Sequence, residues 1–160
     1  MMLRNLSKLS LASTVVALAL STVVLADGHL KLPDLVPQPS PQQVVDEHLD
    51  ALNKCDWDRL MAQYPPEVLI VVADGASFRG REAVGELFEG FCKSHEDGGL
   101  RGLEFKTLET FTVEGTLNVI WEANADFLAE PYKGADAYVT KDGFMYAQVT
   151  TFDGSKLKMK

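Results

Sequence analysis

Hydrophobic side chains recur at every third or fourth position in three stretches of the chain, and this spacing predicts amphipathic helices. The stretches are 41–54, 56–64 and 80–92. Ser40 is a suitable N-cap for the first helix, because its hydroxyl can accept a hydrogen bond from the first helical turn. His48 lies in the middle of the first apolar stripe, where an ionisable side chain is unusual, so it is a candidate functional residue.

β-Branched and alternating hydrophobic residues predict strands in the rest of the chain. The alternation in 117–128 places Leu117, Val119 and Trp121 on one face, which we expect to face the helices. The Lys-Asp-Gly segment at 141–143 predicts a hairpin turn, because glycine readily adopts a positive φ. The order of the elements predicts an α+β fold in which a curved antiparallel sheet wraps over three helices from the N-terminal half. The expected strands are 68–73, 77–79, 103–113, 117–128, 136–140 and 144–152.

The first 26 residues have the features of a secretory signal peptide. Arg4 and Lys8 precede an uncharged, mostly apolar run over 9–25, and a small residue ends the run at Ala26. We expect cleavage after Ala26 and a secreted or periplasmic protein. An uncleaved membrane anchor is the alternative, but this run is short and contains serine and threonine, whereas a membrane span needs about 20 apolar residues.

The mature chain divides into a proline-rich, extended tether over 27–40, one globular domain over 41–152 and a short tail over 153–160. The 160-residue chain has a formal net charge of −8, and loss of the two basic residues of the signal peptide makes it −10. Because an acidic domain repels phosphate groups, we expect neither nucleic acid nor, after signal removal, a membrane as a partner.

Cys55 and Cys92 are the two cysteines of the chain. In an oxidising compartment such a pair favours a disulfide. The alternative is two small buried side chains that never meet. The sequence leaves both open, because a disulfide requires a close approach of the two Cα atoms.

Two groups of polar residues have the composition of metal sites. If cleavage follows Ala26, the mature chain begins Asp27-Gly28-His29, whose amine, amide and imidazole nitrogens suit Cu(II) or Ni(II). Histidine reaches the third position by chance often enough that we expect no metal and no other cofactor. Polar residues alternate over 122–126 without histidines beside them, which favours a solvated or dimer-forming outer sheet face.

Four short motifs occur in a fixed order along the chain. They are 52–58 (LNKCDWD), 78–84 (FRGREAV), 121–123 (WEA) and 134–143 (GADAYVTKDG). Together they resemble motifs of the nuclear transport factor 2-like superfamily, which includes SnoaL-like polyketide cyclases and ketosteroid isomerases. The resemblance covers 41–152 and implies a cone-shaped half-barrel with an apolar cavity under the helices. It implies no single chemistry, because one fold hosts many functions.

The resemblance also implies candidate residues at the bottom of the cavity. His48 stands where ketosteroid isomerases have a tyrosine, and Asp136 stands where they have a late-strand acid. Their proton-abstracting aspartate falls at Val72 or the adjacent Val71, so we do not expect steroid isomerisation by that mechanism. His48 and Asp136 can serve as an acid–base pair. The alternative is that they satisfy each other's hydrogen bonds in an ordinary core.

We expect the domain to bind a small apolar molecule in this cavity and to form a homodimer through the outer sheet face. The second hypothesis is a cyclase, dehydratase or isomerase that uses His48 and Asp136, and the third is a dimeric interaction module without a ligand. A large pocket that reaches His48 favours the first two hypotheses. The candidate ligand-binding residues are aromatic, although aromatic residues at these spacings are also typical of a core: Tyr64, Phe88, Phe91, Trp121 and Tyr138.

Overall fold

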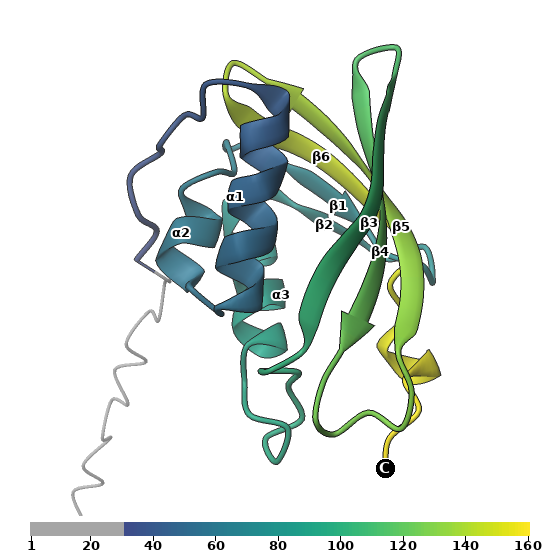
Figure 1. The fold of residues 1–160 in the computed structure, drawn as a ribbon. Helices are drawn as coiled ribbons and strands as arrows, with labels where there is room; N and C mark the ends of the chain where they lie inside the picture. The colour runs from purple at the N-terminus through teal and green to yellow at the C-terminus, as the bar shows by residue number, and fades with distance from the viewer. Residues whose placement is uncertain (1–30) are drawn as a thin grey trace, which may run out of the picture.

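The computed structural model describes residues 31–160, in which one layer of helices packs on one face of a curved sheet (Figure 1). The helices are α1 (Pro41–Asn53), α2 (Trp57–Met61) and α3 (Gly80–Phe91), which are the three that the sequence predicts. No helix in this part of the chain is long and apolar enough to cross a membrane. The predicted signal peptide and the Asp27-Gly28-His29 motif lie outside the described residues.

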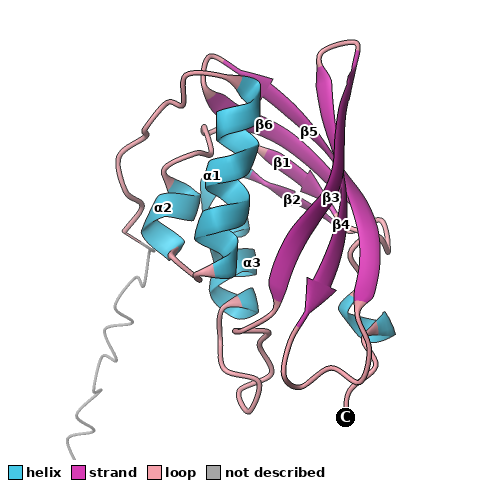
Figure 2. Ribbon diagram, viewed as in Figure 1, coloured by secondary structure: helices cyan, strands magenta, loops and turns pink. Residues whose placement is uncertain are grey.

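Six strands form one sheet that does not close into a barrel, drawn in magenta in Figure 2. Neighbouring strands pair antiparallel except β1 and β6, which run parallel. The predicted α+β fold with a curved sheet is therefore confirmed, but the sheet is mixed rather than wholly antiparallel. No hairpin joins β1 to β6, so no turn motif in the sequence indicated their relative direction. In spatial order the strands are β2 (Ser77–Arg79), β1 (Leu69–Val71), β6 (Phe144–Thr150), β5 (Tyr132–Lys141), β4 (Thr116–Asn124) and β3 (Glu104–Val113), and the 3-10 turn η1 (Gly154–Lys156) follows β6.

Strand β4 buries alternate residues against the helices, as its sequence predicts. Leu117, Val119 and Trp121 are buried, whereas the residues between them are half-buried. The Trp121 indole packs directly over β5, where a Cβ atom at Gly134 would lie only 2.4 Å from Trp121 Cζ2. The strand ends at Asn124 rather than at the predicted 128. Glycine at 134 is thus the residue that lets the largest core side chain lie flat on the sheet.

The predicted N-cap of the first helix, Ser40, is confirmed, and Asp56 caps α2 in the same way. Ser40 Oγ and Asp56 Oδ1 each accept a hydrogen bond from a backbone N–H in the following turn, at 3.3 and 3.2 Å. At the other end of α1, Asn53 donates to the carbonyl of Phe105 at 2.9 Å and accepts from its N–H at 2.8 Å. The first family-like motif therefore both ends α1 and ties it to β3.

Cys55 and Cys92 form a disulfide, which decides between the two alternatives that the sequence left open. Their Cα atoms lie 5.5 Å apart, within the usual range for such bonds. The bond joins the turn between α1 and α2 to the residue that follows α3. It therefore ties the helices to one another and does not involve the sheet.

The end of the predicted tether packs against the domain. Val36 N donates to the carbonyl of Ala62 at 2.9 Å, and Gln38 N donates to the carbonyl of Gly143 at 2.9 Å. Residues 31–40, which we call the N-terminal strap, therefore connect α2 to the β5–β6 turn across the outside of the helices, as Figure 1 shows.

Candidate functional site

The helices and the inner face of the sheet border a partly open cavity of about 110 Å³. Its polar part is formed by Asp136, Gln148 and Thr150, from β5 and β6. The cavity is smaller than the large pocket that favours the first two hypotheses, because large aromatic side chains fill much of the cone. Apolar side chains that line it include Leu49, Val72, Phe88, Phe91, Phe105 and Phe152.

Asp136 is the centre of a buried hydrogen-bond network and is only 7% exposed. Trp121 Nε1 donates to Oδ1 at 2.9 Å, while the Tyr138 hydroxyl and Gln148 Nε2 donate to Oδ2 at 2.8 and 3.0 Å. Thr150 also hydrogen-bonds to this carboxyl group. Burial raises the pKa of Asp136, and the four hydrogen bonds oppose that rise. The carboxylate is thus held firmly, at the wall of the cavity.

His48 is fully buried and bonds to a tyrosine rather than to the aspartate. Its Nδ1 lies 2.9 Å from the Tyr64 hydroxyl oxygen, and its Nε2 has no hydrogen-bond partner within residues 31–160. Burial lowers the pKa of His48 to about 3, so the imidazole is neutral at physiological pH. Which partner donates in the Nδ1–Tyr64 contact depends on which ring nitrogen carries the proton.

His48 and Asp136 lie in one buried cluster, but among the described residues no hydrogen bond joins them. Tyr138 bridges the two: its ring centroid is 5.7 Å from that of His48, and its hydroxyl donates to Asp136. Asp136 lines the cavity, whereas His48 lies in the core behind its wall. Val72 lines the cavity too, where the resemblance places the missing proton acceptor. A catalytic role for the pair stays a prediction.

The five aromatic candidates divide into two groups. Phe88 and Phe91 line the cavity. Tyr64, Trp121 and Tyr138 are fully buried, and their polar atoms hydrogen-bond to the histidine or the aspartate described above. The first group can touch a ligand directly, and the second supports the polar wall. Ligand binding by these residues stays a prediction.

Sequence reasoning missed eight of the residues that line the cavity, among them Phe105, Gln148, Thr150 and Phe152. The last three alternate along β6 and just beyond it, which was an available signal. A register shift in the β5–β6 pair hid their orientation, because alternation counted from the hairpin turn changes face at such a shift. Two polar residues on one face of a strand, here Gln148 and Thr150, are also typical of a face exposed to solvent.

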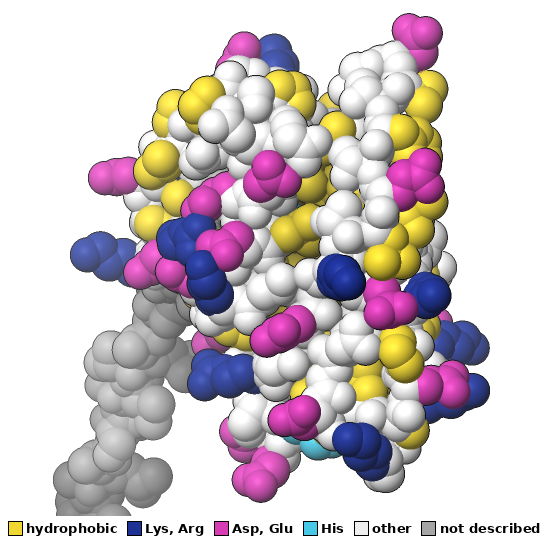
Figure 3. All heavy atoms as spheres, in the orientation of Figure 1, with side chains coloured by type: hydrophobic (Ala, Val, Ile, Leu, Met, Phe, Trp, Pro, Cys, Tyr) yellow, Lys and Arg dark blue, Asp and Glu magenta, His cyan; other side chains and the backbone are white. Residues whose placement is uncertain are grey.

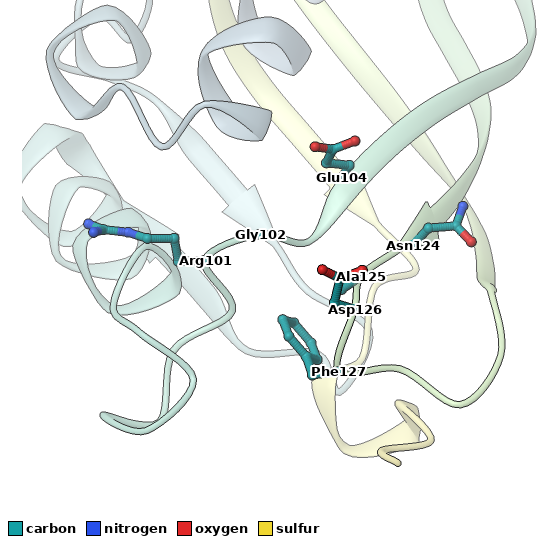
Figure 4. Close-up of a pocket in the computed structure, with 7 residues that line it drawn as sticks. All are labelled: Arg101, Gly102, Glu104, Asn124, Ala125, Asp126 and Phe127. Carbon is teal, nitrogen blue, oxygen red and sulfur yellow. The ribbon is translucent and has the colours of Figure 1, made fainter.

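A larger hollow of about 500 Å³ opens on the surface at the ends of β3 and β4 (Figure 4). Glu104 and Asp126 border it, but Arg101 turns away from them toward α3, and its Nε donates to the Cys92 carbonyl at 2.9 Å. These polar groups do not converge on one point, so we favour the cavity between the helices and the sheet as the functional site. Within residues 31–160, no group of three or more His, Cys, Asp or Glu side chains is arranged to hold a metal ion.

Comparison with known sequences gives one family. Residues 45–155, most of the described chain, match the SnoaL-like domain. No curated protein sequence matches the chain.

Solved structures share this fold at low sequence identity. A nuclear transport factor 2-like protein of unknown function from Cytophaga hutchinsonii is 14% identical with a TM-score of 0.58, and the match covers 74% of this chain and 94% of that one. A protein with a ketosteroid isomerase-like fold from Catenulispora acidiphila, in complex with trimethylamine, is 12% identical with a TM-score of 0.55, covering 74% and 91%. A computationally designed 17-OHP binder is 17% identical with a TM-score of 0.59, covering 73% and 93%. At these identities the likeness shows the fold alone.

Proposed function

Because the chain belongs to the SnoaL-like domain family of the nuclear transport factor 2-like superfamily, we propose that it is an exported protein that binds a small apolar ligand in its cavity. The observation that carries the proposal is an apolar cavity with one polar wall, formed by Asp136, Gln148 and Thr150. Ligand pockets typically combine such apolar linings with a few fixed polar groups. Two structural neighbours that hold or were designed to hold small molecules support the same use of the fold.

The cavity volume limits the ligand to a molecule of few atoms. An engineered apolar cavity of roughly 150 Å³ accommodates benzene, and this cavity measures about 110 Å³. A steroid is far larger, so this chain is not suited to the ligand of the designed neighbour without rearrangement. We therefore propose a compact ligand of about this size, for which tert-butanol is a suitable probe.

The test is to fill the cavity and compare the loss of binding with a matched control. Val72 lines the cavity, whereas Val139 is exposed on the outer sheet face, so both can be changed to phenylalanine. We expect ligand-observed NMR to detect tert-butanol binding to the wild type and to the Val139→Phe protein but not to the Val72→Phe protein. Equal binding by all three proteins, or by none, would reject the cavity as the binding site.

Acid–base catalysis by His48 and Asp136 has less support than ligand binding. The imidazole is neutral with a pKa of about 3, and it does not line the cavity that a substrate would occupy. A general acid or base must come within hydrogen-bond reach of the reacting group, directly or through one water. We therefore keep ligand binding as the proposed function.

Export is part of the proposal and rests on Arg4, Lys8 and the uncharged run that ends at Ala26. The disulfide in the described domain supports it, because such bonds persist mainly in oxidising compartments. Intact-mass measurement on protein from its native host should give a chain that starts at Asp27. A full-length chain retained in the membrane would contradict export.

The outer sheet face supports a homodimer. Figure 3 shows hydrophobic side chains gathered along the edge of the molecule where β3 and its neighbours run. Because the protein carries a net charge of −8, two copies approach with least repulsion through an uncharged surface. The strand register aligns two adjacent rows without a charged residue: Phe111, Asn118, Ala137 and Val149 in one, and Val113, Thr116, Val139 and Ala147 in the other.

A further inference from the structure

The carboxylate in the cavity wall has no positively charged partner in the described chain. The hydrogen-bond donors to Asp136 are the indole, hydroxyl and amide groups of Trp121, Tyr138, Gln148 and Thr150, all of which are neutral. The ion pairs found within residues 31–160 join other carboxylates, all of them nearer the surface. Buried charges in proteins are usually paired, because an isolated ion loses its hydration.

The pattern of donors favours the ionised form of Asp136. An indole N–H and an amide N–H can only donate, and here they donate to different oxygens: Trp121 to Oδ1 and Gln148 to Oδ2. Both oxygens therefore accept hydrogen bonds, which stabilise the charged carboxylate and oppose the effect of burial. The nearby imidazole of His48 supplies no compensating charge, since it is neutral.

The rest of the wall suits the other end of a small cation. Phe88, Phe91, Phe105 and Phe152 all line the cavity. The faces of aromatic rings carry negative electrostatic potential, so they attract cations as well as methyl groups. An anion at one side and four phenylalanine rings among the apolar residues of the other sides give the site a consistent sign of charge.

We propose that the ligand is a small alkylammonium ion, whose charged nitrogen faces Asp136 and whose alkyl groups lie among the four phenylalanine rings. This inference rests on the proposed binding function and adds the charge class of the ligand. The net charge of −8 on the protein attracts such a cation from solution. The ion supplies the positive charge that Asp136 lacks within the described residues. It also has the compact shape that the cavity requires.

The test compares two probes with the same carbon frame, tert-butylammonium and tert-butanol, by NMR titration of the disulfide-bonded protein at neutral pH. We expect tert-butylammonium to bind about tenfold more tightly or better, which is a modest gain for a desolvated ion pair with aromatic neighbours. Asp136→Asn should remove this preference, because the amide carries no charge. Asp126→Asn is the matched control, because it removes the same charge from the exposed hollow and should change neither affinity.

The outcomes separate this inference from the function on which it rests. If tert-butanol binds and tert-butylammonium binds no more tightly, the cation is excluded while the apolar binding site stands. If neither probe binds, both proposals fail. An effect of Asp126→Asn equal to that of Asp136→Asn would place the cation in the surface hollow and overturn the assignment. Should Asp136→Asn fail to fold, Phe105→Leu decides: it must weaken tert-butylammonium binding more than tert-butanol binding.

Discussion

At the scale of single residues, the burial of His48 makes stability depend on pH. The unfolded chain takes up this proton near pH 6.5, whereas the folded protein resists it until about pH 3. The stability that the buried, neutral His48 contributes is therefore fully present above pH 6.5, and it is lost as the pH falls from 6.5 toward 3. We expect wild type to lose about 3 kcal/mol more of its unfolding free energy between pH 7 and pH 4 than the His48→Phe protein, measured by urea denaturation.

The control for this prediction is His95, whose imidazole is exposed. His95→Gln should keep the wild-type dependence on pH. Asp136 contributes in the opposite direction, since its raised pKa favours the folded state as the pH falls, but it is common to all three proteins. If the unfolding free energies of wild type and His48→Phe changed with pH in the same way, burial of the imidazole would not affect its titration, and the prediction would be wrong.

Tyr64 is expected to be coupled to the same histidine. Tyr64→Phe removes the hydroxyl that lies 2.9 Å from His48 Nδ1 and leaves both ring nitrogens unpaired. This should cost about 1–3 kcal/mol of unfolding free energy. In a His48→Phe background the same change should be close to neutral, which a double-mutant cycle measures. An equal cost in both backgrounds would mean that the hydroxyl has another essential partner.

The sequence predicted these residues only in part. The apolar stripe of α1 was sufficient to predict that His48 faces the core, and the motif at 134–143 was sufficient to place Asp136 near it. The separate hydrogen-bond partners of His48 and Asp136 were not predictable. They depend on ring orientations, which are set by packing between the helices and the sheet. A shift of an ångström or two decides whether an imidazole meets a carboxylate or a tyrosine hydroxyl.

At the scale of elements, the disulfide should stabilise the helical layer. It closes a sequence separation of 37 residues, for which the chain-entropy estimate is about 3–4 kcal/mol. We expect the Cys55→Ala/Cys92→Ala protein to lose about that much unfolding free energy in denaturant titrations. Reductant should lower the stability of the wild type to a similar value and leave the double variant unchanged. A variant as stable as oxidised wild type would contradict the prediction.

Local chemistry predicted the elements well and their assembly less well. Caps at Ser40 and Asp56, the alternation along β4 and the glycine turn before β6 are properties of neighbouring residues, so the sequence displays them directly. The parallel pairing of β1 with β6 and the register shift in β5–β6 depend on residues far apart in the chain. No local pattern encodes such pairings, and the cavity size depends on both.

At the scale of the whole molecule, the uncharged sheet face should control the oligomeric state. Val149→Asp introduces a charge into the aligned row and should convert a dimer to a monomer, as measured by light scattering after gel filtration. Val36→Asp is the matched control, because Val36 in the N-terminal strap is as exposed as Val149, at 52%, but lies away from this face. A monomeric wild type at micromolar concentration, or equal dissociation by both variants, would reject the sheet interface.

The N-terminal strap has a consequence for the order in which the chain folds as it is made. Gln38 precedes the first helix, yet its amide is held by the carbonyl of Gly143, in the last hairpin. A growing chain cannot close this contact until nearly all of it is present, since contacts between distant residues form only when both partners are available. Protection of the Gln38 amide from hydrogen exchange therefore reports when folding is complete, because this protection requires the β5–β6 turn.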